Sequence, residues 1–167
     1  MTGLNYKRDK IMEIAVLITN GDLEIIDEGL EYVVRVDESI LNKMDEWCTK
    51  QHGLSGLTQA SLNSPNSIDF VAGRVLEYIK RWVPEPRTAV LAGNSVHADR
   101  AFLLEEMPEV VDYLHYRIEL CRRWYPSLPR PDLHIQSKHR ALDDIKGSIK
   151  ELRYYRDNVF VPPESRR

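Results

Sequence analysis

The sequence has few of the features that mark secreted, membrane-spanning or strongly cationic proteins. It contains two cysteines, Cys48 and Cys121, which lack metal-ligand spacing and suit free thiols in a reducing compartment. Positive charge is not in excess, since 23 Lys and Arg stand against 26 Asp and Glu, so no bulk cationic field favours long nucleic acid. No apolar run of membrane-spanning length is visible, which predicts no membrane association. No targeting segment is visible either, and the location, mitochondrial, cytoplasmic or both, stays open because any presequence would lie upstream of Met1.

The composition is that of a globular domain. Hydrophobic residues make up 43% of the 167 residues and charged residues 29%, a balance that supplies a core without indicating disorder. The length suits one domain. We therefore expect a single domain over residues 1–160, followed by a flexible tail over residues 161–167.

The first third of the chain has the pattern of an antiparallel meander. Residues 11–19 are rich in Ile and Val, the segment 20–22 is the turn signal Asn-Gly-Asp, and 23–29 and 30–36 are two further strand-like runs. The period then changes to that of a helix capped by Asp37. Its apolar positions are Ile40, Leu41, Met44, Trp47 and Cys48, and Gly53 is a plausible stop.

Helices and a short strand alternate in the rest of the chain. An apolar stripe predicts a helix over residues 68–82. Residues 88–95 are expected to be a short strand that leads into a Gly-Asn-Ser turn. Pro108 breaks the next helix, which continues after it. A long helix is expected over residues 140–159, with Leu142, Ile145, Ile149 and Leu152 as its core face. The pattern indicates an α/β fold, a mixed sheet flanked by helices.

Two helix starts carry residues that suit chemistry. Asp99 follows the Gly-Asn-Ser turn, and His139 lies just before the last helix, with Asp143 and Asp144 in its first turns. Acids at these places also interact favourably with the helix dipole, which is a purely structural explanation. The functional alternative is a carboxylate that binds a divalent cation, beside a histidine that acts as general base. Each motif alone is weak, and the helical period does not separate Asp143 from Asp144.

Together, the motifs resemble a known family over almost the whole chain. The segments "MTGL", "EWCTKQHGLSGLT", "AGNSVHADRAFL", "LHYRI", "ELCRRWYP" and "HRALDDI" occur in the order of the oligoribonuclease branch of the DEDDh 3′→5′ exonucleases. This resemblance implies a ribonuclease H-like fold and a homodimer. It also implies hydrolysis of short RNA, notably dinucleotides, to 5′-mononucleotides with two Mg²⁺ or Mn²⁺ ions.

The resemblance also assigns residues. Asp99 and Asp144 match metal-binding carboxylates, and His139 matches the general base. The apolar pair that contacts the bases is matched by Leu4 and Trp47, although the helical period by itself would place Trp47 in the core. His52 and Ser95 match groups that bind the terminal phosphate. Tyr116 and Arg117 match residues that reach the active site of the neighbouring subunit. Without the resemblance, Tyr116 and Arg117 would be an ordinary surface pair.

Two departures from the family set expectations for this chain. The family's first acidic motif, Asp-x-Glu, stands immediately before "MTGL", where this chain has Met1. A short segment is also absent between Ile118 and Glu119. We therefore expect the first strand and two of the four metal-binding carboxylates to be missing, with poor metal binding and impaired hydrolysis.

Two other functions stay open at this stage. One is a non-catalytic nucleotide-binding or RNA-binding dimer, and another is a purely structural dimerisation module. A zinc site at His134 and His139 is disfavoured, because no cysteine or further histidine stands at a suitable spacing.

Overall fold

The computed structural model describes residues 1–120 and 140–159 of the chain. Its strands are β1 Glu13–Val16, β2 Leu30–Val33, β3 Leu91–Gly93 and β4 Ile118–Leu120. Its helices are α1 Glu38–Leu41, α2 Glu46–Leu54, α3 Leu57–Asn63, α4 Ile68–Trp82, α5 Val96–Glu106, α6 Pro108–Tyr113 and α7 Ala141–Val159. Strands and helices follow each other as expected for an α/β domain.

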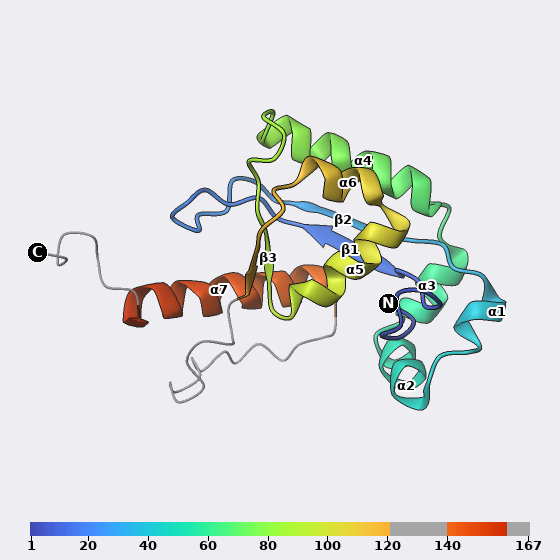
Figure 1. The fold of residues 1–167 in the computed structure, drawn as a ribbon. Coiled ribbons are helices and arrows are strands. Elements are labelled where there is room, and N and C mark those ends of the chain that lie inside the picture. Colours follow the sequence, from blue (N-terminus) through green and yellow to red (C-terminus); the bar gives the residue numbers. More distant parts are fainter. Residues whose placement is uncertain (121–139, 160–167) are drawn as a thin grey trace, which may run out of the picture.

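The described strands form two short pairs of opposite type. β1 and β2 are antiparallel, with Ile14 opposite Tyr32, whereas β3 and β4 are parallel, with Ala92 opposite Glu119. Figure 1 shows α4 and α7 on opposite sides of β1 and β2. α7 contacts both β1 and β3, so it connects the two pairs. The mixed sheet content flanked by helices confirms the expected fold class.

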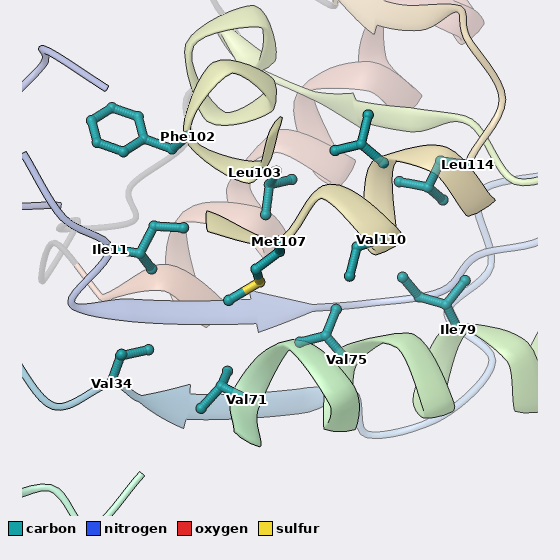
Figure 2. Close-up of a cluster of buried hydrophobic side chains, with 11 residues drawn as sticks. Ile11, Val34, Val71, Val75, Ile79, Phe102, Leu103, Met107, Val110 and Leu114 are labelled. Atoms are coloured by element: carbon teal, nitrogen blue, oxygen red, sulfur yellow. The ribbon is translucent and has the colours of Figure 1, made fainter. Parts of the chain in front are cut away.

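The main core lies between α4 and the α5–α6 region. Val71, Val75 and Ile79 of α4 are at most 3% exposed and point toward Met107 and Val110 (Figure 2). The predicted helix over residues 68–82 is therefore confirmed at both ends. Its start is capped by Ser67, whose hydroxyl accepts a hydrogen bond from the Phe70 N–H at 3.2 Å.

The expected helix after Asp37 is two separate helices. Asp37 stands before the short α1, but its side chain makes no cap hydrogen bond. Asp45 starts α2, since its carboxylate accepts a hydrogen bond from the Cys48 N–H at 2.7 Å. α2 runs to Leu54, through Gly53 rather than stopping before it. The cap at Asp45 therefore starts a second helix within the run that the apolar spacing had predicted to be one helix.

The structure differs from the expected secondary structure at several further places. Residues 23–29 form no named strand, only an isolated bridge between Thr19 and Ile25. α3 was missed because its buried face contains Ser61, whose hydroxyl donates to the Val34 carbonyl at 2.6 Å, in place of an apolar residue. The helix after Pro108 ends at Tyr113. β4 runs through the junction of Ile118 and Glu119, so this part of the chain is still a strand.

The last helix occupies the predicted residues, but its buried face differs. Glu151 and Tyr155 are the buried residues of α7, and the four apolar residues expected there are only half-buried. The reason is a polar network, described below, that draws Glu151 inward. Within the described ranges 1–120 and 140–159, no helix is long and apolar enough to cross a membrane. The predicted tail over residues 161–167 lies outside the described residues, as does Cys121.

A polar cluster centred on Asp27 attaches the loop before β2 to α4. Its carboxylate accepts hydrogen bonds from the Tyr78 hydroxyl, from the Trp82 Nε1–H at 3.0 Å and from the Gly29 N–H at 2.9 Å. The hydrogen bond from Tyr78 lowers the pKa of Asp27 below its ordinary value. The ionised carboxylate is therefore the form that stabilises this attachment.

The core predicts a large difference between two phenylalanines. Phe102 is 2% exposed, so Phe102→Ala should lower the free energy of unfolding by about 3–5 kcal/mol through lost burial and a cavity. The matched control is Phe70→Ala, because Phe70 is 49% exposed and should cost about 1 kcal/mol or less. Urea denaturation measures both variants, and equal losses would contradict the packing.

The Asp27 cluster predicts a pH-dependent contribution to stability. A carboxyl group whose pKa is lowered in the folded state contributes stability above its unfolded pKa of about 4, and this contribution is lost as the pH falls through the folded value. Asp27→Asn should therefore lower Tm at pH ~7, with the gap to the parent closing below pH ~4. Asp112→Asn, on the exposed side of α6, is the control and should show no such trend. A gap that does not change with pH would refute the role of ionised Asp27.

Candidate active site

The N-terminal loop is folded back on itself and presents Leu4 to solvent. The Thr2 N–H donates to the Lys10 carbonyl and the Lys10 N–H to the Thr2 hydroxyl, both at 2.9 Å. Asp9 accepts from the Asn5 N–H at 2.9 Å. With the backbone held in this way, Leu4 is 87% exposed. It lines an open cavity of about 600 Å³ together with Tyr6, Arg8, Lys43 and Asp45.

α2 presents a second exposed apolar side chain. Cys48 and His52, four residues apart, form its buried face, at 6% and 8% exposure. Trp47 lies one position away from that face and is 57% exposed. The core position that the helical period favoured for Trp47 is therefore wrong, and the exposed position agrees with the resemblance. His52 Nε2 lies 2.9 Å from the Met1 carbonyl oxygen, so His52 contacts the loop that carries Leu4.

Asp99 lies in the first turn of α5, beyond the turn that ends β3. Ser95 precedes the helix with φ at 55°, a left-handed backbone, and is exposed. Asp99 is half-buried, and this burial raises the pKa of its carboxyl group. An acid held in this setting gains from a nearby cation, because partial burial disfavours an isolated negative charge.

Asp144 lies in the first turn of α7, which is held by Glu13 of β1. Glu13 Oε1 accepts a hydrogen bond from Arg140 Nε at 2.8 Å and forms an ion pair with Arg140 Nη2 at 2.5 Å, and Oε2 accepts from the Ala141 N–H at 3.0 Å. The hydrogen bond that Arg140 donates to Glu13 raises the pKa of Arg140. Asp144 itself is exposed, and its N–H donates to the Arg140 carbonyl at 3.1 Å. Its neighbour Asp143 is half-buried.

A second contact joins α7 to the turn that leads into α5. Asn94 Nδ2 donates to Glu151 Oε2 at 2.8 Å and to the Ser148 hydroxyl at 3.2 Å. Glu151 Oε1 accepts from the Tyr155 hydroxyl at 3.1 Å. The helix that carries Asp99 and the helix that carries Asp144 are therefore connected through a largely buried polar network.

The remaining site residues are exposed or undescribed. Tyr116 is 73% exposed, and its ring stacks on His115 with centroids 4.5 Å apart. The Arg117 guanidinium carbon lies 5.6 Å from the centroid of the Tyr116 ring. His139, predicted as the general base, and His134 of the zinc alternative lie outside the described residues.

Sequence reasoning missed the residues that hold these elements together. They are Glu13, Asn94, Arg140 and Glu151. Only Glu13 had a visible signal, because a charged residue inside the apolar run 11–19 is out of place unless it is paired. The partners of the others come from distant parts of the chain, so no local pattern indicates them.

The metal-binding capacity of the described residues is limited. Asp99 and Asp144 offer carboxylate oxygens, the ligand type that Mg²⁺ and Mn²⁺ prefer. However, over residues 1–120 and 140–159, no three Asp, Glu, His or Cys residues gather closely enough to hold a metal ion. The donors thus fit divalent metal in type and fall short in number within this part of the chain.

Comparison with known proteins shows the family. Residues 1–152 match the exonuclease family RNase_T. The chain belongs to this exonuclease family. It is 44% identical over 163 residues to the probable oligoribonuclease of Schizosaccharomyces pombe, covering 93% of this chain and 64% of that protein. The mitochondrial oligoribonuclease of Bos taurus is 44% identical over 167 residues, covering 96% and 70%.

Relatives occur in bacteria as well as in mitochondria. The oligoribonuclease of Nocardia farcinica is 42% identical over 170 residues, covering 98% of this chain and 79% of that protein. The resemblance found in the sequence motifs is therefore confirmed. Exonucleases of this family generally depend on divalent metal ions. The chain spans about two thirds of the length of the first relatives that it matches, 64% and 70%.

The exposure of Trp47 leads to a stability prediction. Trp47→Ala should change the free energy of unfolding by less than about 1 kcal/mol, because little of the core is removed. Trp82→Ala is the matched control and should cost more, since the indole N–H of Trp82 donates to Asp27. Denaturant titrations compare the two variants. A larger loss for Trp47→Ala would place its side chain in the core after all.

Proposed function

We propose that this chain is the nuclease domain of a 3′→5′ exoribonuclease that degrades short oligoribonucleotides, notably dinucleotides, to 5′-mononucleotides. The match to the exonuclease family over residues 1–152 carries the proposal. The relatives named oligoribonuclease support the substrate class. Since those relatives include mitochondrial and bacterial proteins, we propose a mitochondrial or cytoplasmic location.

The substrate surface in this proposal consists of exposed groups. Leu4 and Trp47 contact the bases, and both side chains are open to solvent, at 87% and 57% exposure. An indole face stacks on any base, which suits an enzyme without sequence preference. Ser95 and His52 bind the terminal phosphate, which would restrict the enzyme to very short RNA. The exposed side chain of Ser95 supports phosphate binding directly, whereas the ring of His52 is buried, at 8% exposure.

The proposed assembly is a homodimer. Tyr116 and Arg117 reach the active site of the neighbouring subunit, where an arginine fork suits a phosphate. The 73% exposure of Tyr116 and its stacking on His115 support a side chain held ready for such a contact.

Two divalent cations, Mg²⁺ or Mn²⁺, are the proposed cofactors. Asp99 and Asp144 are the metal-binding carboxylates of this chain, and His139 is the general base. When bound, the ions supply an acidified water and stabilise the leaving oxygen. The family's general dependence on divalent metal and the oxygen donors of the two aspartates support this assignment.

Hydrolysis by the 167-residue chain is severely impaired in our proposal. Two carboxylates do not neutralise two divalent cations, and the described residues contain no group of three or more metal ligands. The dimer interface and the base-contacting residues do not depend on the metal. Dinucleotide binding should therefore survive where hydrolysis is weak.

A dinucleotide hydrolysis assay with Mn²⁺ tests the proposal. The chain should turn over at least about 100-fold more slowly than the bovine relative, because metal ligands set both metal affinity and rate. Asp99→Asn and Asp144→Asn should abolish the residual rate, whereas Asp112→Asn on the exposed side of α6 should retain it.

Two outcomes would contradict parts of this proposal. Turnover equal to that of the bovine relative would refute the impairment. Dinucleotide binding without any hydrolysis above that of the Asp99→Asn variant would instead favour the non-catalytic binding protein.

A further inference from the structure

A buried carboxylate on β1 is fully engaged with the beginning of α7. The side chain of Glu13 is 4% exposed, although the strand around it is apolar. One oxygen accepts a hydrogen bond from Nε of Arg140 at 2.8 Å and forms an ion pair with its Nη2 at 2.5 Å, and the other accepts from the Ala141 N–H at 3.0 Å. Both oxygens of the carboxylate are thus bonded to α7 or to the residue directly before it.

Stability alone is a poor explanation for this pair. Burying a carboxylate carries a large desolvation cost, and an apolar residue of similar volume packs equally well or better in many proteins. What the arginine fork adds is direction, because Nε and Nη2 converge on the same oxygen, Oε1, and so fix the orientation of the guanidinium. The Ala141 N–H is one of the helix-start donors without an intrahelical partner, so Glu13 also fixes where α7 begins.

The turn held in this way carries Asp144. The Asp144 N–H donates to the carbonyl of Arg140, the residue that Glu13 binds. The residues just before β1 are tied to the last residue of α5, because Glu106 accepts from the Ile11 N–H at 2.8 Å and forms an ion pair with Lys10 Nζ at 3.0 Å. α5 carries Asp99 in its first turn. The beginning of β1 is therefore a common support for the two helices that present the carboxylates.

We propose that Glu13, through Arg140 and Ala141, is a positioning residue that sets the place of the Asp144 carboxylate relative to Asp99. The proposal rests on the proposed function of these two aspartates. Glu13 touches no substrate in this role and acts only through the first turn of α7. The middle of α7 is held independently by Asn94 and Glu151, so loss of Glu13 loosens the first turn and leaves the helix docked.

The test compares three variants of the 167-residue chain. Glu13→Gln removes the charge at constant shape, and Arg140→Lys keeps the charge but removes the fork. Glu151→Gln is the matched control, because it changes the other buried carboxylate contact of the same helix. Hydrogen exchange of the Asp144 and Ile145 amides, global Tm, and kcat and KM for Mn²⁺-dependent dinucleotide hydrolysis are measured for each.

A positioning role predicts a specific combination of results. In Glu13→Gln and Arg140→Lys the Asp144 and Ile145 amides should exchange about tenfold faster, as expected for the loss of about one charge-assisted hydrogen bond. The residual kcat should fall by a similar factor with KM unchanged, since Leu4 and Trp47 lie on other elements. Glu151→Gln should lower Tm without faster exchange at Asp144. A purely structural role would instead lower Tm alike in Glu13→Gln and Glu151→Gln and leave kcat per folded molecule unchanged.

Other results would overturn the proposal or separate it from the proposed function. Unchanged exchange at Asp144 and Ile145 in folded Glu13→Gln would overturn it, as would faster exchange with an unchanged kcat. If the parent chain shows no hydrolysis that depends on Asp99, the proposed function fails, and the exchange data alone decide whether Glu13 holds the turn. If Glu13→Gln does not fold, Arg140→Lys decides, because that side chain is 34% exposed and tolerates substitution better.

Discussion

A buried carboxylate needs hydrogen-bond partners, and this requirement holds the domain together at the beginning of β1. Glu106 meets it with the Ile11 N–H and Lys10, and Glu13 meets it with Arg140 and the Ala141 N–H. In each case a cation and a backbone donor share the carboxylate. The strand thereby joins α5, α7 and the N-terminal loop, which contain Asp99, Asp144 and Leu4 of the candidate site.

The candidate site contains two kinds of residue, exposed side chains and aspartates on helices that are anchored to the sheet. The side chains proposed to contact bases, Leu4 and Trp47, are open to solvent, and neither contributes to the core. Asp99 and Asp144 instead stand on helices that are attached to the sheet by buried polar contacts. This division has a physical reason, since apolar stacking tolerates loose placement, whereas shared metal coordination demands fixed distances.

Sequence patterns located some elements well and others poorly. α4 and α7 lie where they were predicted, because a long helix repeats its signal over several turns and Ser67 adds a cap at the start of α4. α2 and α3 were misjudged, since Asp45 caps a new helix within the apolar run, and since His52 of α2 and Ser61 of α3 are buried polar side chains. Periodicity assumes that buried positions are apolar. It fails where a polar side chain is buried with a distant partner.

The sequence by itself determined the family and the α/β class, and it predicts the residues that we propose to carry the chemistry. These follow from motif order, local periodicity and residue type, all of which are read along the chain. The tertiary structure alone decided that Trp47 is exposed, that Glu151 is buried, and that Glu13 binds the start of α7. The contacts of Glu151 and Glu13 depend on partners far away in the sequence, since Glu13 and Arg140 are separated by 127 positions. Such partners are set by how the helices pack on the strands, which no local pattern contains.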